Sequence, residues 1–251
     1  MSSFLATARP AISVIIPTLN EAHSLGATLR AVARFGHGRS IEVIVVDGGS
    51  TDATRDIARG QGAHRVVSAA RGRGAQMRAG ALEARGGVLW FLHADTLPPP
   101  DAPAQILDAL GRDARIVGGN FQISFDGAFF AARFLTWLYP QLRKLGLCYG
   151  DSAIFVRADA YRAVGGFRPF PIFEDLDLVR RLKRRGRMVH LRARVVTSSR
   201  RFEGRSFART FARWSFLQVL YWLGVSPHTL SRLYAPVRRG HGGGGDGGRA
   251  S

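Results

Sequence analysis

Cysteine is almost missing from this sequence. Cys148 is the single cysteine among 251 residues, so no disulfide can form within the chain, and the sequence gives no support for an oxidising compartment. Acidic residues are also scarce, because 18 Asp and Glu stand against 36 Lys and Arg, which gives a net charge of +18. Such an excess attracts polyanions such as nucleic acid, acidic lipid or a diphosphate-bearing substrate, but it does not choose among them.

Long apolar runs are missing as well. No stretch reaches the roughly 20 apolar residues that a membrane-spanning helix needs. The two nearest approaches, 128–140 and 214–225, are rich in aromatic residues, and each is expected to form a core or lid helix or to lie in a membrane interface. Residues 1–10 carry no basic segment followed by an apolar core, which argues against a secretory signal. We therefore expect a cytoplasmic protein, with peripheral contact at the inner face of the membrane as a further option.

Several nucleotide-binding and nucleic-acid-binding motifs are absent. The sequence has no GxGxxG after its first apolar run and no GxxxxGK[ST], so the fingerprints of a Rossmann dinucleotide site and of a P-loop are missing. It has no RRM, helix-turn-helix or zinc pattern, and its arginines are scattered over the whole chain. A basic nucleic-acid-binding protein stays open as an alternative, but no specific nucleic-acid partner is expected.

The first part of the chain alternates between strand-like and helix-like patterns. Apolar runs at 12–16, 41–46 and 88–92 are typical of strands buried on both faces of a sheet. Helical patterns separate them, and this alternation within little more than 80 residues indicates βαβ units. The fold class that we predict is α/β, with a doubly wound, mostly parallel sheet and helices on both faces.

The helix starts in this part can also be predicted. Asn20 is the expected N-cap of the first helix, and Ser50 or Thr51 the expected N-cap of a second helix that carries Asp52 in its first turn. A third helix is expected from about Gly74 to Ala84.

Beyond residue 115 the pattern is less regular. Runs 116–125, 152–156 and 188–196 are strand-like, and 173–186 has apolar residues on one helix face. This half is expected to supply the acceptor side of a cleft. The domain organisation that we predict is an N-terminal extension (1–11), a main domain (12–200) with a nucleotide-binding half (12–115) and an acceptor half (116–200), an aromatic-rich helical segment (201–237) and a flexible Gly-rich tail (238–251).

The short motif "RGRG" at 71–74 lies where the third helix is expected to begin. The free N–H groups of a helix start, together with Arg71 and Arg73, would suit an anionic group such as phosphate. A solvated basic turn is the alternative interpretation.

Acidic residues follow two apolar runs and begin a helix. Asp47 and Asp95 each end a predicted strand, and Glu174 and Asp175 begin the helix over 173–186. A lone Asp in such a place is most often a turn residue, and acids at a helix start are favoured by the macrodipole. Carboxylates at the ends of neighbouring parallel strands, however, also lie where open α/β sheets bind ligands. With His93, Asp95 could hold Mg²⁺ or Mn²⁺ if substrate phosphates supplied the remaining ligands.

Four motifs in this order resemble the signatures of family 2 glycosyltransferases of the GT-A fold: "SVIIPTLNE" (13–21), "VVDGGSTD" (45–52), "LHADT" (92–96) and "FED" (173–175). The resemblance covers residues 12 to about 200. The stretches "RGRGAQM", "YGDSAIFVR" and "RLYAPVR" are similar to a bacterial subgroup that is often encoded beside radical-SAM enzymes and sometimes labelled arsenosugar-biosynthetic.

The resemblance implies roles for individual residues. Asp175 would be the general base with Glu174 beside it, and Asp95 would bind the divalent cation, Mn²⁺ or Mg²⁺, together with His93. The family's Asp-x-Asp is here His-Ala-Asp, so its first carboxylate is replaced by an imidazole. The residues expected to bind the nucleotide sugar are Pro17, Thr18, Asn20, Glu21, Asp47, Arg71, Arg73, Gly74, Ala94 and Asp151, with Asp47 near the base or ribose.

The implied reaction is the transfer of a sugar from a nucleoside-diphosphate donor to a hydroxyl acceptor, with inversion at the anomeric carbon, because one base and one displacement need no nucleophilic carboxylate. The acceptor, a small molecule or a lipid-linked hydroxyl, is left open. A nucleotidyltransferase on a similar α/β scaffold is the alternative enzyme, but "PTLNE" is not the Gly-rich basic loop that such enzymes place after the first strand.

Overall fold

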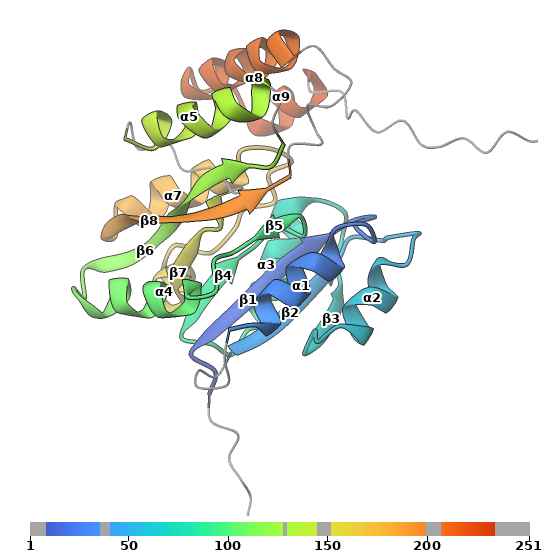
Figure 1. The fold of residues 1–251 in the computed structure, drawn as a ribbon. Helices are drawn as coiled ribbons and strands as arrows, with labels where there is room; N and C mark the ends of the chain where they lie inside the picture. Colours follow the sequence, from blue (N-terminus) through green and yellow to red (C-terminus); the bar gives the residue numbers. More distant parts are fainter. Residues whose placement is uncertain (1–8, 36–40, 128–129, 145–151, 199–206, 234–251) are drawn as a thin grey trace, which may run out of the picture.

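The computed structural model describes residues 9–35, 41–127, 130–144, 152–198 and 207–233 (Figure 1). The strands are β1 (Ile12–Thr18), β2 (Ile41–Asp47), β3 (Arg65–Ser68), β4 (Val88–Phe91), β5 (Thr96–Leu97), β6 (Ile116–Phe125), β7 (Phe155–Arg157) and β8 (Arg187–Thr197). The helices are α1 (Leu25–Ala33), α2 (Thr54–Gly60), α3 (Arg73–Glu83), α4 (Ala102–Gly111), α5 (Phe130–Lys144), α6 (Ala158–Ala163), α7 (Glu174–Lys183), α8 (Phe207–Trp222) and α9 (Pro227–Leu233).

All of the described strands belong to one sheet, in the order β3-β2-β1-β4-β7-β6-β8-β5. The first four strands in this order are parallel, whereas β7 runs antiparallel to both of its neighbours. β6 and β8 are again parallel, and β5 pairs antiparallel with β8. The α/β class and the mostly parallel sheet are therefore confirmed, and each antiparallel pairing involves at least one strand from beyond residue 115.

Apolar residues on both faces of the sheet explain the continuous hydrophobic runs of the central strands. In β1 the side chains do not alternate between buried and exposed, because residues 12–16 are all buried. Val14 and Ile16 pack with Leu29 of α1 on one face, and Ile15 packs with Met77 of α3 on the other face. Because helices cover both faces, no strand position in this part can be polar without a specific partner.

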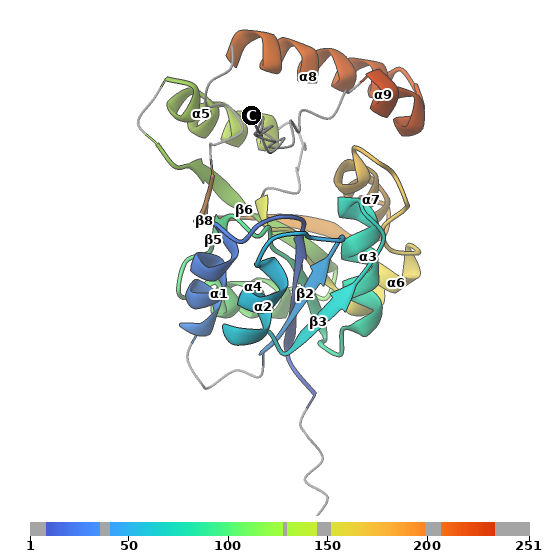
Figure 2. The same ribbon diagram turned by 90° about the vertical axis from the view of Figure 1, so that its right-hand side faces the viewer.

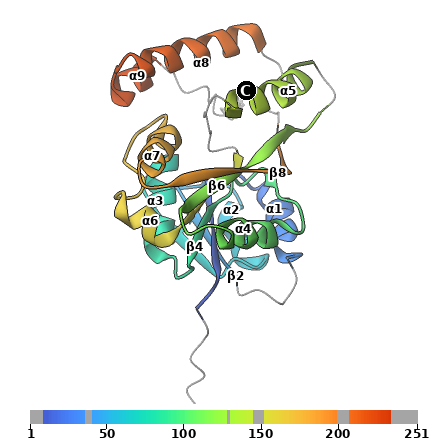
Figure 3. The ribbon, with the colours of Figure 1, turned by 90° about the vertical axis from the view of Figure 1, so that its left-hand side faces the viewer.

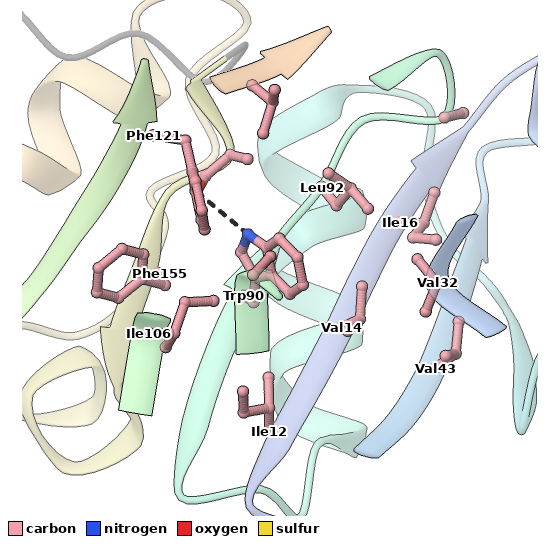
Figure 4. Packing of buried hydrophobic residues seen from close by; sticks show 14 of the residues in the cluster. Ile12, Val14, Ile16, Val32, Val43, Trp90, Leu92, Ile106, Phe121 and Phe155 are labelled. Carbon is pink, nitrogen blue, oxygen red and sulfur yellow. Dashed lines mark hydrogen bonds between the residues drawn. The ribbon is translucent and has the colours of Figure 1, made fainter. Parts of the chain in front are cut away.

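Trp90 of β4 lies where the parallel half of the sheet meets the antiparallel strand β7 (Figure 4). Its indole ring packs between Phe35 and Phe121, with centroid distances of 5.7 Å to each. Its Nε1–H donates to the carbonyl oxygen of Ala153 at 3.2 Å. A single large side chain thus joins the two halves, and the only polar atom of that side chain is satisfied.

Three helices, α5, α8 and α9, form a separate group on one side of the sheet, which we call the helical layer (Figures 1–3). Within it, the rings of Phe134 in α5 and Phe211 in α8 meet edge to face at 6.0 Å. The layer contacts the rest of the protein in two places. Ala132 and Leu135 of α5 belong to the main core together with Phe125 of β6, and Phe173, just before α7, packs with Leu217 and Leu230. Among the described helices, including these three, none combines the length and the apolar character needed to cross a bilayer.

Two predicted helix starts are wrong, and local hydrogen bonds explain both. Residues 21–24 first form a turn, in which the N–H of Leu25 donates to the Glu21 carbonyl at 2.9 Å, so α1 begins later and Asn20 is not its cap. Asp52 lies before α2 rather than in its first turn, and its Oδ1 accepts from the Thr54 N–H at 3.0 Å. The N-cap position of α2 is occupied by Ala53, which makes no side-chain cap hydrogen bond, so neither Ser50 nor Thr51 caps this helix.

Most other element boundaries lie within a few residues of those predicted. The helix expected from Gly74 to Ala84 begins and ends one residue earlier, and the run 116–125 forms β6 with the expected bounds. The strand predicted over 152–156 is confirmed only for its last two residues, because the segment begins with a turn in which Ala153 has φ 51°, and β7 covers Phe155–Arg157. The predicted Gly-rich tail and most of the N-terminal extension lie outside the described residues.

Candidate active site

Three of the predicted site segments come together because parallel strands end at one edge of the sheet. Thr18 and Asp47 are the last residues of β1 and β2 and are direct partners in the register of these strands. β4 lies on the other side of β1, and His93 and Asp95 follow its end by a few residues. The carboxyl edge of a parallel sheet is where ligands of α/β proteins bind.

The loops that leave β1 and β2 are held to each other by a ladder of hydrogen bonds. The Asn20 N–H donates to Ser50 Oγ at 2.9 Å, and Asn20 Oδ1 accepts from the Thr51 N–H at 2.8 Å. The next N–H, that of Glu21, donates to Thr54 Oγ1 at 2.8 Å. Asn20 reaches this position through a left-handed backbone conformation, φ 55°. Thus the side chain predicted to cap a helix instead fixes the distance between two site loops.

The carboxylate of Asp47 is buried and is used within its own loop. It accepts from the N–H groups of Gly49 and Ser50, each at 3.1 Å, and Arg55 Nε lies 3.4 Å from it. In this structure Asp47 therefore orders the loop after β2, which resembles an Asx turn. Its predicted contact with the base or ribose stays a prediction.

A second meeting point joins the start of α3 to the start of α7. Arg73 forms an ion pair with Glu174 through Nε, and its Nη2 lies 4.0 Å from Asp175 Oδ2. The two carboxyl side chains are only 1% and 5% exposed, so Arg73 compensates charges that are almost removed from water. The predicted basic turn and the predicted Glu-Asp pair, about 100 residues apart in sequence, thus belong to one site.

Gly74 makes this approach feasible. A Cβ built on Gly74 would lie 3.1 Å from the carbonyl oxygen of Arg168 and 3.2 Å from Glu174 Cβ. A larger residue would force its neighbours to shift by a few tenths of an ångström, so the glycine favours the close contact of the two helix starts. Arg71, two residues before α3, is exposed and lies at the outer side of this turn.

Phe173, which precedes the Glu-Asp pair, is held in a left-handed conformation with φ 60°. Asn20, Ala153 and Phe173 are the non-glycine residues with positive φ in the described part of the chain. Such conformations are unfavourable for ordinary side chains and often mark functional sites. Two of the three are in predicted site motifs, and the third lies two residues after Asp151, which is itself outside the described residues.

Two backbone carbonyls help to fix the segment His93-Ala94-Asp95. The carbonyl of Ala94 accepts from Thr28 Oγ1 at 2.8 Å, and that of Asp95 accepts from the Ser198 N–H at 3.2 Å. The described residues contain no group of three or more His, Cys, Asp or Glu side chains placed to hold a metal ion. One carboxylate and one imidazole fit a cation of the Mg²⁺ or Mn²⁺ type only if the substrate supplies further oxygens, which is usual for such ions.

Gln76 is a site residue that the sequence interpretation missed. It is buried on α3, and its Nε2 donates to the carbonyls of Thr18 at 2.6 Å and Val46 at 2.9 Å. It therefore links the phosphate-binding candidate helix to the ends of both β1 and β2. The sequence signal that could have identified Gln76 is its place as a polar residue on the apolar face of the expected helix, next to Met77.

The remaining predicted residues, Pro17 and Glu21, are both half-buried. Pro17 is the second-last residue of β1, and Glu21 lies in the loop that follows this strand. Glu21 Oε2 accepts from Ser24 Oγ at 2.8 Å, so its carboxylate helps to order the turn before α1.

Comparison with known proteins shows the family of this chain. The family model described as glycosyl transferase family 2 matches residues 13–164, and the chain belongs to this family. It is 29% identical over 175 residues to glycosyltransferase AglE of Haloferax volcanii, covering 64% of this chain and 56% of that protein. It is 32% identical over 176 residues to a PGL/p-HBAD biosynthesis glycosyltransferase of Mycobacterium bovis, covering 64% of each. The chain thus spans somewhat less than two thirds of the length of these relatives.

Solved structures share the fold. A mannosyltransferase from Pyrobaculum calidifontis in complex with GDP-Man and Mn²⁺ aligns with a TM-score of 0.58 and 20% identity, over 76% of this chain and 57% of that one. Glucosyl-3-phosphoglycerate synthase from Mycobacterium tuberculosis, in complex with Mn²⁺, UDP and glucosyl-3-phosphoglycerate, aligns with a TM-score of 0.59 and 21% identity, over 86% and 81% of the chains. The fold is that of the GT-A glycosyltransferases.

Proposed function

We propose that this protein transfers a sugar from a nucleoside-diphosphate sugar to a hydroxyl acceptor. The observation that carries the proposal is the contact of Arg73 with Glu174 and Asp175, which joins a basic helix start to a buried carboxyl pair beside the carboxyl edge of the sheet. One part suits a diphosphate and the other suits proton removal. Membership of glycosyl transferase family 2 and the nucleotide sugars bound by the structural neighbours support the same assignment.

The nucleoside would lie against the loops after β1 and β2. Their hydrogen-bond ladder fixes the pocket floor before the donor arrives, which lowers the entropy lost on binding. Pro17, Thr18, Asn20, Glu21 and Asp47 supply this part. Arg71, Arg73 and the N–H groups from Gly74 onward would bind the diphosphate, and Ala94 and Asp151 would complete the sugar side.

Asp95, with His93, would hold the divalent cation. Such a cation, Mn²⁺ or Mg²⁺, stabilises the negative charge that grows on the leaving diphosphate. The structural neighbours bound to Mn²⁺ or Mg²⁺ support this proposal. The neutral imidazole of His93 in place of a carboxylate removes one negative charge from the site and moves its preference toward Mn²⁺.

Asp175 is the base in this proposal. The acceptor oxygen attacks the anomeric carbon, the bond from that carbon to the diphosphate oxygen breaks, and the hydroxyl proton passes to the Asp175 carboxylate. A single displacement inverts the anomeric centre. Glu174 acts as a positioning residue, because its ion pair with Arg73 ties the base to the diphosphate side of the site.

The helical layer is the proposed contact with an anionic membrane surface. Seven of the ten large apolar side chains that are exposed in the described ranges lie in or directly after its helices: Phe130, Trp137, Phe216, Val219, Trp222, Leu223 and Leu233. The three helices contain basic residues and no acidic one: Arg133, Arg143, Lys144, Arg209, Arg213 and Arg232. Exposed aromatic groups beside positive charge favour a headgroup region with acidic lipids. A protein bound at the membrane surface in this way can reach either a lipid-linked acceptor or a soluble one.

A thermal-shift screen tests the donor site directly. UDP, GDP and their sugar derivatives are added with Mn²⁺, with Mg²⁺ or with a chelator. We expect at least one nucleoside diphosphate to raise the melting temperature, and to raise it further with the cation. If no nucleotide stabilises the protein under any of these conditions, the proposed function is wrong.

A further inference from the structure

Gln218 of α8 is a buried amide without a hydrogen-bond partner in the described structure. The residue is 3% exposed, and neither its Nε2 nor its Oε1 is paired or reached by solvent. Leaving a carboxamide unpaired in the interior is unfavourable, and nearly all buried amides in proteins are satisfied. Hydrogen bonds from a ligand would satisfy both atoms of this amide.

Gln218 lies on the face of α8 that packs near the proposed base. Trp214, Gln218 and Tyr221 follow at i, i+4 and i+7, so they lie on one face of α8. The rings of Trp214 and Tyr221 both contact Phe173, with centroid distances of 6.2 Å and 4.9 Å. Because Phe173 directly precedes Glu174 and Asp175, these two rings of α8 lie next to the start of α7.

Tyr221, one turn further along the same face of α8, also carries a buried polar atom. Its hydroxyl oxygen is buried and has no hydrogen-bond partner in the described structure. Burial raises the pKa of Tyr221, and Asp175 and Asp177 act in the same direction, whereas Arg180 and Arg168 oppose them. The phenol therefore stays protonated at neutral pH and can donate a hydrogen bond.

We propose that Gln218 and Tyr221 form an acceptor-binding site for a hydroxyl-rich ligand, a sugar or a polyol. This inference rests on the proposed function. A carboxamide offers both a donor and an acceptor, as does a phenol, and a sugar hydroxyl can satisfy both kinds of group. The rings of Trp214, Phe173 and Tyr221 supply apolar surface for the C–H faces of such a ligand. Because the amide and phenol are covered, the ligand enters by separating α8 from the start of α7.

The test compares Gln218→Leu and Tyr221→Phe with the parent protein. The probe is methyl β-D-glucopyranoside, and its binding to the full chain is followed by saturation-transfer NMR, with and without UDP or GDP and Mg²⁺. We expect binding by the parent protein and a loss of about tenfold in each variant, the effect of one or two missing hydrogen bonds. Gln105→Leu is the control, because this half-buried glutamine of α4 pairs only with Asp101 among the described residues, Nε2 to Oδ2 at 2.8 Å, and its replacement should leave probe binding unchanged.

Thermal melting separates binding from folding. Replacing an unpaired buried amide by a leucine of similar volume should leave the melting temperature of Gln218→Leu unchanged or raise it. A clear fall would show that the amide has a protein partner and would overturn the proposal. Failure of the parent protein to bind the probe, or equal binding by parent and both variants, would overturn it as well. Nucleotide binding is measured in the same proteins. If a nucleotide still raises the melting temperature of the parent protein and of both variants, the failure concerns the acceptor site and not the proposed function.

Discussion

The carboxyl edge of the sheet and the helical layer differ in how far their polar side chains are paired and their apolar side chains are buried. At the sheet edge, polar side chains such as Asn20, Asp47 and Gln76 are buried or paired by loops that bind each other. In the helical layer, aromatic groups such as Trp137 and Trp222 are exposed, and the amide of Gln218 is buried without a partner in the described structure. The polar groups of the first region are satisfied within the protein, whereas the second region leaves polar atoms unpaired and aromatic rings exposed in the described structure. This difference is what the proposed assignment of the donor to the first region and of the acceptor to the second predicts.

The substitution Asp175→Asn is expected to have the largest effect, and it distinguishes loss of the proposed base from loss of donor binding. Loss of the base should lower the transfer rate by about 100- to 10,000-fold, while the donor affinity stays nearly unchanged, because the base acts on the acceptor proton. Release of nucleoside diphosphate and a nucleotide melting shift measure the two quantities. Asp108→Asn, an exposed acid on α4, serves as control, and a variant Asp175→Asn that keeps its rate would exclude Asp175 as base.

Asp95→Ala should affect the donor side instead. We expect it to remove most of the cation-dependent stabilisation by nucleotide, which is about 2.7 kcal/mol for a ligand at 100 times its Kd. Melting curves with UDP or GDP, with Mn²⁺ and with chelator, give this quantity. An unchanged cation effect would show that His93-Ala94-Asp95 is not the cation site.

Glu42→Gln tests the opposite, structural edge of the sheet. Glu42 is buried and accepts from Ser13 Oγ at 2.5 Å and the Arg85 N–H at 2.6 Å. Burial alone would raise the pKa of Glu42, but the hydrogen bonds from Ser13 and Arg85 outweigh it and lower the pKa. The carboxylate therefore stabilises the fold above its unfolded pKa, and this contribution is lost as pH falls through the folded value.

For Glu42→Gln we expect a loss of about 1–3 kcal/mol in the free energy of unfolding at neutral pH. The difference from the parent protein should narrow in acid. Denaturant unfolding at several pH values measures it, and Glu83→Gln, whose exposed carboxylate pairs with Arg65 at 3.0 Å, should change little. A difference that grows on acidification would contradict the assigned direction.

The smallest expected effect concerns the membrane contact. Trp222→Ser should weaken binding to vesicles of phosphatidylglycerol and phosphatidylcholine by about tenfold, the effect of losing one partly inserted apolar side chain. Leu82→Ser is the matched control, because Leu82 is an exposed apolar residue on α3, outside the helical layer. Cosedimentation at low and high salt measures both, and salt should weaken binding. Equal losses in the two variants would remove the helical layer as the contact surface.

The contrast between the regions also explains what the sequence could predict. Strands 12–16, 41–46 and 88–92 could be found because a strand covered on both faces must be apolar throughout. The meeting of Arg73 with Glu174 was not visible, since nothing in sequence spacing tells which helix starts will touch. The cap assigned to Asn20 failed because its amide binds a loop 31 residues away, and a local rule cannot include such a partner. Gln218 was not noticed, because only burial makes an ordinary glutamine unusual.

Gly74 has a consequence for how such a protein can change. Its lack of a side chain lets the turn that begins α3 lie directly against Glu174. Under the proposed function, this contact would keep the diphosphate side and the base at a fixed separation, whereas residues of the helical layer would be freer to differ with the acceptor. A bulkier residue at position 74 is therefore expected to disturb both proposed parts of the site at once.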